Sequence, residues 1–480
     1  MTSNTLRRTV PATLALAACL TSVSAPAFAT SAPAPARVAT AAVGAGQERV
    51  VADLERNAQE LRSTVPGGPS RDLRALSAMT KGATIVGIGE VTHGSKELFT
   101  LRHRMFRHLV QTQGFTTLAL EATWSAGVRL DAYVRTGKGD LRTIMAEEFQ
   151  QSYGAWKTQE WMDLYEWMRD YNRTASRKLR VMGFDIGDVH PEQYRRILAW
   201  AKQHQPSLEP ELRRRYAGLL ALPAGVEERM NTLAALPAER RTALAADAQA
   251  AYRLLDGSGK ASLRVLQEAR VIVQMTTMYA LDGSALHRHR DRAMAENTVW
   301  WQRHTGSKTV AAAHNGHIGY VSAWPDLYPV TQGAVLRSLA GTSYVAIGTT
   351  IHSGRFRAID PKTGQVAVFD TGTPVPDSSE AVLDRVRYRD YYVDLRRAGR
   401  TPSTRAWLDT ARPTFTIPAT YVPEQFNRPL ALGAAFDVIL HLNRVEAATP
   451  LPCPSFPGAG RPMVTQVAWL PSKRCHVVDQ

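Results

Sequence analysis

Six side chains that can exchange protons stand at the ends of four apolar runs in the sequence. They are Glu90 with His93, Glu121, Asp185, and His314 with His317. Carboxylates and imidazoles act as general acids and bases, and their pKa values shift when they are gathered together. Parallel strands open a ligand crevice at their carboxyl ends. We therefore expect these side chains to meet at one edge of a sheet, although each alone also suits a cap or a loop hydrogen bond.

Glu90 and His93 are the closest of these pairs, three residues apart with glycines on both sides. The glycines permit tight turns, so the carboxylate and the imidazole can point into one crevice. Such a pair is a general base with its orienting group, because the carboxylate fixes the imidazole tautomer. The alternative is a strand end followed by a helix that Thr92 or Ser95 caps, in which His93 is incidental.

His314 and His317 are also three residues apart, in His-Asn-Gly-His. Their spacing is compatible with metal binding, with donation to an oxyanion, and with acid–base catalysis. Other common catalytic motifs are absent: there is no Gly-x-Ser-x-Gly elbow, no P-loop and no His-Glu-x-x-His. The segment 287–291 (His-Arg-His-Arg-Asp) resembles a dinuclear metal motif, but it lies at the start of an expected helix.

The elements that must position these residues alternate along the chain. Buried strands are expected at 83–90, 116–121, 179–185, 308–314, 343–348, 366–369 and 436–440. Amphipathic helical spacing follows the first of them, at Leu98, Leu101, Met105 and Leu109, and ends near Gly114. The alternation predicts an α/β fold with a central, mostly parallel sheet flanked by helices.

One segment of about 90 residues breaks this alternation, from 191 to 280. It has no strand signal and consists of Ala-, Leu-, Arg- and Glu-rich helical stretches. We expect it to be a helical insertion that forms a lid or a side bundle on a single domain spanning 47–445.

The composition excludes several classes of protein. Apolar residues make up 44% and charged residues 21% of the 480 residues, which is ordinary globular usage. The formal net charge is +15, but the basic residues are spread along the chain without interleaved aromatics, so we do not expect nucleic-acid binding. No run approaches the ~18 apolar residues of a membrane-spanning helix. The sequence carries no signal for a particular oligomeric state.

The amino-terminal 29 residues have the features of a secretory signal. Arg7 and Arg8 precede an apolar run, and a small-x-small cleavage site ends at Ala29. We expect the protein to be secreted by the Sec or the Tat route. A disordered leader is expected to follow the signal segment, at 30–46. Lipid anchoring through Cys19 is the alternative, because the residues before it fit a lipobox.

The carboxyl-terminal segment 446–480 is rich in proline. Cleavage at the signal site would leave two cysteines, Cys453 and Cys475, and an exported protein with two thiols is expected to pair them.

Four segments together resemble the erythromycin esterase family, in order and spacing, over roughly residues 75–445. They are Gly89-Glu-Val-Thr-His-Gly94, Gly114-Phe115 with Ala119-Leu-Glu121, Arg290-Asp-Arg-Ala-Met-Ala-Glu-Asn297, and Ala313-His-Asn-Gly-His317. The resemblance implies hydrolysis of an ester, or of the lactone ring in macrolide esterases, without a covalent serine intermediate. By extension it implies a role in antibiotic resistance.

The family's functional positions fall on Glu90, His93, Arg102, Glu121, His314 and His317. The resemblance implies that His93 deprotonates the attacking water and that Glu90, with Glu121, orients it. Arg102 would stabilise the oxyanion or pair with Glu121. His314 and His317 would stabilise developing charge or protonate the leaving alkoxide.

Three functional hypotheses follow from these residues. The first is an esterase that acts on a small-molecule ester or lactone and needs no cofactor. The second uses the same Glu and His side chains to hold a divalent metal ion that activates water. The third is a ligand-binding member of the family without enzymatic activity.

Overall fold

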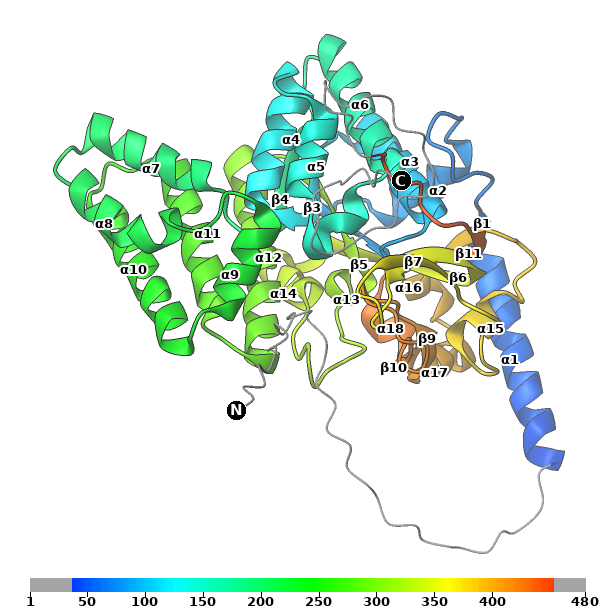
Figure 1. The fold of residues 1–480 in the computed structure, drawn as a ribbon. Coiled ribbons are helices and arrows are strands. Elements are labelled where there is room, and N and C mark those ends of the chain that lie inside the picture. Colours follow the sequence, from blue (N-terminus) through cyan, green and yellow to red (C-terminus); the bar gives the residue numbers. More distant parts are fainter. Residues whose placement is uncertain (1–36, 453–480) are drawn as a thin grey trace, which may run out of the picture.

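The computed structural model describes residues 37–452, and its centre is one large sheet (Figure 1). The strands of this sheet are β1 (Ala58–Glu60), β2 (Ile85–Glu90), β3 (Phe115–Thr123), β4 (Arg180–Asp185), β5 (Lys308–His314), β6 (Tyr344–Ile359), β7 (Val366–Asp370), β8 (Tyr391–Asp394) and β11 (Val438–Val445). Their order is β1-β8-β11-β6-β2-β5-β3-β4, with β7 paired to β6. A separate two-stranded sheet joins β9 (Arg412–Phe415) to β10 (Asn427–Leu430).

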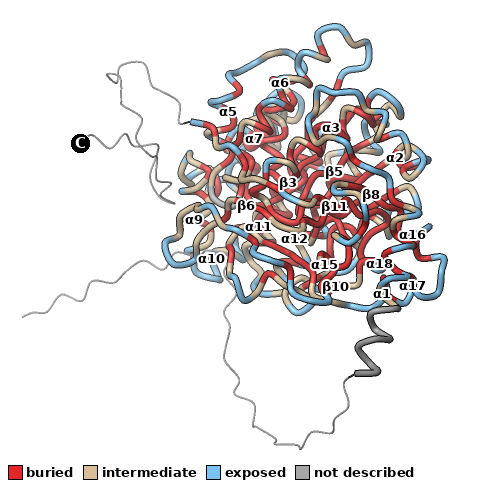
Figure 2. Tube along the Cα trace, turned by 90° about the vertical axis from the view of Figure 1, so that its right-hand side faces the viewer, coloured by how far each residue is buried: buried red, intermediate tan, exposed pale blue. Residues whose placement is uncertain are grey.

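Six neighbouring strands of the large sheet are parallel, from β11 through β6, β2, β5 and β3 to β4. β1, β7 and β8 are antiparallel additions at one side. The parallel strands β2 and β3 are buried along their whole length, as expected for strands covered on both faces (Figure 2). The predicted α/β fold with a central, mostly parallel sheet is confirmed.

Helices cover both faces of the sheet, and alternate residues of each strand pack against opposite layers. In β5, Val310 and Ala312 join one apolar core and Ala311 and Ala313 join the other. The first core is covered by α2 (Arg74–Met79), α3 (Lys96–Gln113), α5 (Leu141–Glu148) and α6 (Gln159–Thr174). The second core is covered chiefly by α1 (Arg37–Asn57), α12 (Gly283–Thr305), α14 (Gln332–Ala340), α17 (Pro402–Asp409) and α18 (Leu432–Ala435).

α4 (Trp124–Thr136) also packs against the first core. Three further helices are short connections: α13 (Asn315–Ile318), α15 (Ser379–Leu383) and α16 (Leu395–Ala398). α3 shows why the local sequence forms its element: its apolar positions are spaced three and four apart, and all are buried. It ends at Gly114, whose φ of 70° gives the left-handed cap that glycine adopts without strain. None of the helices between residues 37 and 452 is long and apolar enough to cross a membrane.

The segment expected to be a helical insertion contains five helices. They are α7 (Pro191–His204), α8 (Glu209–Leu220), α9 (Val226–Ala235), α10 (Ala238–Gly257) and α11 (Leu263–Tyr279). They form a bundle that extends to one side of the sheet (Figure 1). Arg229 of α9 ties this bundle to the turn after β4 through a two-pronged contact with Asp188, at 2.6 and 2.7 Å. Both side chains are only 1% exposed.

The two ends of the domain differ from the expected boundaries. The leader was expected to be disordered to residue 46, but α1 begins at Arg37. Its first ten residues contain no proline and are rich in alanine, the strongest helix former. At the other end, residues beyond 445 still pack on the domain, since Ala448 N–H donates to Gly94 O at 2.8 Å. The signal segment, Cys19 and the Cys453–Cys475 pair lie outside the described residues.

We predict that Arg229→Met lowers the free energy of unfolding by about 3–5 kcal/mol, because it leaves the Asp188 carboxylate buried without its partner. Arg195→Met is the matched control: the Arg195–Glu192 pair is 63% and 56% exposed, and such pairs contribute at most about 1 kcal/mol. Thermal unfolding of both variants at pH 7 measures the difference. Equal melting temperatures for the two variants would show that the buried pair does not hold the bundle.

Candidate active site

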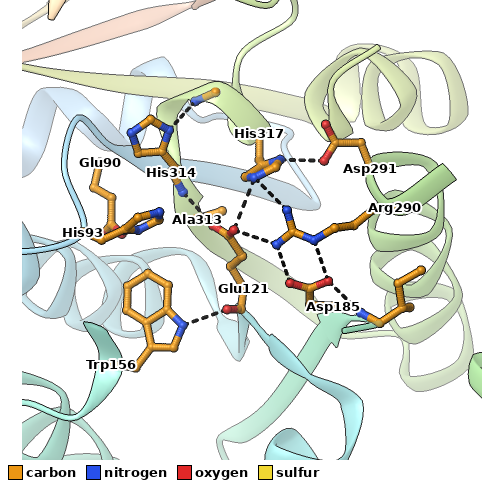
Figure 3. Close-up of polar contacts among 12 residues, drawn as sticks. Glu90, His93, Glu121, Trp156, Asp185, Arg290, Asp291, Ala313, His314 and His317 are labelled. Carbon is orange, nitrogen blue, oxygen red and sulfur yellow. Dashed lines mark hydrogen bonds and ion pairs between the residues drawn. The ribbon is translucent and has the colours of Figure 1, made fainter. Parts of the chain in front are cut away.

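The strand order explains how residues far apart in the sequence come together. β2, β5, β3 and β4 are consecutive neighbours in the sheet, and each carries one of the expected side chains at or near its carboxyl end: Glu90, His314, Glu121 and Asp185. Glu90 lies directly opposite His314 in the register of β2 and β5. The structure therefore gathers all four at one edge of the sheet, as the apolar runs predict (Figure 3).

An irregularity in β3 sets the position of Glu121. Leu120 pairs with Gly183, but the next pairing joins Thr123 to Asp185, so β3 contains one extra residue here. Such bulges redirect side chains and are frequent beside active sites. Gly183 permits the close approach, because a Cβ at this position would lie 1.9 Å from Thr123 O.

Glu90 connects two basic side chains. His93 Nδ1 lies 2.7 Å from Glu90 Oε1, and Arg102 Nη1 lies 2.6 Å from Glu90 Oε2. Glu90 is fully buried and Arg102 is 1% exposed, whereas His93 is 13% exposed. Since a carboxylate only accepts hydrogen bonds, Nδ1 of His93 carries the proton. Nε2 of the neutral ring therefore keeps its lone pair.

The structure corrects the expected role of Arg102. This residue was expected to stabilise an oxyanion or to pair with Glu121. Its guanidinium instead pairs with Glu90 and donates to the carbonyl oxygens of Ile88 and Ala313, at 3.2 and 3.4 Å. Because this side chain of α3 is only 1% exposed and its contacts are with Glu90 and these carbonyls, it positions Glu90.

A second charged network contains the arginine that pairs with Glu121. Arg290 of α12 donates hydrogen bonds to both carboxylate oxygens of Asp185, at 3.0 and 2.5 Å, and to Glu121 Oε1 at 2.9 Å. His317 joins the same network, with Nε2 3.2 Å from Glu121 Oε1 and Nδ1 2.5 Å from Asp291 Oδ1. The sequence analysis assigned no role to Arg290 and Asp291, although both lie in a segment that carries the family resemblance.

The network keeps His317 protonated. Burial alone would lower the pKa of His317, but the carboxylates of Asp291 and Glu121 outweigh it and raise the pKa to about 10. Burial likewise opposes ionisation of Glu121, yet His317, His93 and Arg290 hold its pKa well below the usual range. The site therefore contains two cations, Arg290 and His317, beside the ionised Glu121.

His314 differs from His317 although the two are three residues apart. Its Nε2–H points to the carbonyl oxygens of Val91 and Ile417, at 3.2 and 3.1 Å, and its Nδ1 accepts Gly316 N–H at 3.1 Å. Burial, with the neighbouring His93, lowers the pKa of His314 to about 3. His314 is thus a neutral ring with both nitrogens engaged by backbone groups.

Trp156 forms a wall of the site that the sequence analysis did not identify. It ends a 3-10 helix (Gln151–Trp156), and its Nε1–H donates to Glu121 O at 2.8 Å. The His93 ring lies 5.1 Å from the Trp156 ring, edge to face, and 4.9 Å from the His314 ring. No acid–base motif marks this tryptophan, so only the fold reveals it.

The donor set at this edge is already engaged by protein partners. Both oxygens of Glu90 and Glu121 face cations or backbone N–H groups, and the lone pair of His314 accepts a backbone N–H. Across residues 37–452, no group of three or more His, Cys, Asp or Glu side chains could hold a metal ion. In the observed arrangement the oxygens of Glu90 and Glu121 are therefore paired with protein groups.

Comparison with known proteins agrees with this architecture. The family described as erythromycin esterase matches residues 110–445. Erythromycin esterase type II of Escherichia coli is 23% identical over 340 residues, which cover 61% of this chain and 74% of that protein. The putative hydrolase YbfO of Bacillus subtilis is 28% identical over 153 residues, 32% of each protein.

Solved structures share this fold. A Bacillus cereus protein has a TM-score of 0.77 and 31% identity, covering 85% of this chain and 99% of its own. A succinoglycan biosynthesis protein has a TM-score of 0.76 and 27% identity, and the match covers 84% of this chain and 99% of that protein. An erythromycin esterase mutant in its open conformation shares the fold, with a TM-score of 0.62 and 17% identity. The match covers 81% of this chain and 98% of that protein. Because the family match spans more than half of the sequence, the chain belongs to the erythromycin esterase family of hydrolases.

Proposed function

We propose that this protein hydrolyses a carboxylic ester or lactone of a small molecule with a water molecule activated by His93. The observation that carries the proposal is the 2.7 Å contact between His93 Nδ1 and Glu90 Oε1. It leaves Nε2 of a partly exposed imidazole as the base, beside two buried cations. The E. coli relative named erythromycin esterase type II makes macrolide lactones the first substrates to test.

The first step places a proton on His93. The water oxygen attacks the acyl carbon, its proton passes to Nε2, and the carbonyl π electrons move onto the carbonyl oxygen. Glu90 stabilises the imidazolium because its carboxylate already accepts the Nδ1 proton. Arg102 pairs with Glu90 in a buried position, so the base has a fixed orientation before substrate arrives.

The second step needs positive charge and a proton donor, and Arg290 with His317 can supply both. Their charges lie beside the developing oxyanion in a site with little water, where electrostatic stabilisation is strongest. The intermediate collapses by breaking the bond to the alkoxide. The alkoxide takes a proton from the His93 imidazolium or from His317, and the products are a carboxylic acid and an alcohol.

Direct attack by water is favoured over a covalent nucleophile. Among the described side chains of residues 46–150 and 153–452, His93 forms no hydrogen bond to a hydroxyl or a thiol group, and its side-chain partner is Glu90. A triad would require a serine, cysteine or threonine at that place.

We predict that His93→Ala lowers kcat by about 10²–10⁴-fold, the usual contribution of a general base. Mass spectrometry of erythromycin and a panel of other lactones measures the gain of one water. His204→Ala, at an exposed position on α7, is the control and should retain full activity. Turnover that persists in His93→Ala would exclude His93 as the base. Activity that disappears with a chelator and returns with added metal would favour the metal hypothesis.

We predict that hydrolysis declines as pH rises through about 10, because His317 then loses its proton. Asp291→Asn removes a carboxylate that raises the pKa of His317, so the basic limb should move to lower pH. The pH profile of kcat, with nitrogen-15 NMR of the His317 ring, measures both shifts. Glu296→Gln, on the same helix and paired with Arg270, should leave the profile unchanged. An unmoved basic limb in Asp291→Asn would contradict a role for protonated His317.

A further inference from the structure

A pocket of about 340 Å³ lies at the free edge of β4, away from the charged network. Its walls come from β4, α4, α11 and α12, and none of the six predicted site residues lines it. β4 is the last strand of the sheet, so α4 and α12 flank an edge that no further strand covers. The volume falls near the lower end of the ~300–1,000 Å³ typical of small-molecule sites.

Three tryptophans, Trp124, Trp300 and Trp301, line this pocket, which we call the indole pocket. Trp124 lies 5.8 Å from Trp300 and 6.0 Å from Trp301 between ring centroids, both edge to face. Trp124 is 3% exposed, and its indole N–H has no hydrogen-bond partner among the described residues. Because this nitrogen has almost no exposed surface, Trp124 offers a ligand its apolar ring.

The mouth of the indole pocket is strongly basic. A second pocket of about 250 Å³ shares Arg135, Arg180 and Thr305 with it and adds Arg177 and Lys178. Each of these cations sits at the amino-terminal end of β4 or on the neighbouring helix end. The two pockets are therefore continuous at a rim that attracts anions.

Asp131, the one carboxylate that lines these pockets, is already hydrogen-bonded to protein groups. Asp131 accepts three hydrogen bonds from Arg180, at 2.8 to 3.1 Å, and a fourth from Val181 N–H at 3.0 Å. Arg180 also lies over the Trp301 ring at 5.0 Å, which holds it in place. Arg135 reaches Asp131 only at 3.8 Å, so its charge remains available at the rim.

The chemistry of the lining selects one class of ligand. Guanidinium and ammonium groups are donors only, so a ligand that contacts the basic rim must supply acceptors there. The indole wall favours an aromatic body, and the arginine rim favours a carboxylate. We propose that the indole pocket binds a small aromatic carboxylic acid, with the ring against the tryptophans and the carboxylate at Arg135 and Arg177.

Calorimetric titration of the purified protein with 2-naphthoate and with the neutral 2-naphthamide tests this proposal. We expect naphthoate to bind at one site and the amide to bind at least tenfold more weakly, since it lacks the charge. The double variant Arg135→Gln with Arg177→Gln should weaken naphthoate binding at least tenfold, because both residues are exposed and can be changed without disturbing the core. Arg292→Gln, exposed on α12 and outside the pocket, is the matched control.

A second measurement does not depend on the variants. In the wild-type protein, naphthoate should shift the indole N–H resonance of Trp124. This resonance is assigned by its loss in Trp124→Phe. Absence of naphthoate binding up to its solubility, equal binding of acid and amide, or an unmoved Trp124 resonance would each overturn the proposal. Neither titration measures ester hydrolysis, so their outcome is independent of the proposed function.

Discussion

The site depends on one buried ion pair, Arg102 with Glu90. A carboxylate with no exposed surface is costly to ionise unless a cation and hydrogen bonds replace the water it loses. Arg102 supplies that charge from α3 while it is itself tied to backbone carbonyls of β2 and β5. Because both partners are enclosed, Glu90 has a fixed position and can hold the His93 ring in one tautomer.

A second constraint is the order of the strands. β5 returns to the sheet between β2 and β3, which places the His314–His317 turn between Glu90 and Glu121. The two histidines of this turn then meet different surroundings. Burial holds His314 neutral, with backbone groups at both ring nitrogens, whereas Asp291 and Glu121 hold His317 charged. A single short motif thus contributes one positioning residue and one cation.

The turn that carries His93 is also held from outside the sheet. Gly94 O accepts the N–H groups of Arg357 and Ala448, and Ala448 belongs to the segment expected to be a proline-rich tail outside the domain. The next residue in that segment, Thr449, accepts the N–H of Gln159, just after the loop with Trp156. The carboxyl-terminal segment therefore joins the base and the aromatic wall.

The sequence could predict the parts of this site that local patterns encode. Continuous apolar runs mark the buried strands, and polar residues at their ends mark the edge where Glu90, Glu121 and His314 meet. The partner of Arg102 could not be predicted, because the choice between Glu90 and Glu121 depends on packing across the sheet. The Arg290–Glu121 contact spans 169 residues and a bulge in β3, neither of which has a local signal.

The tautomer of His93 tests the central claim most directly. Nitrogen-15 NMR of the imidazole near pH 8, assigned by the loss of its signals in His93→Ala, distinguishes a protonated Nδ1 from a protonated Nε2. The account predicts a neutral ring with the proton on Nδ1, held by Glu90, and an unprotonated Nε2 toward the site. A ring with its proton on Nε2 would contradict the account, because such a ring could not take a proton from water at that atom.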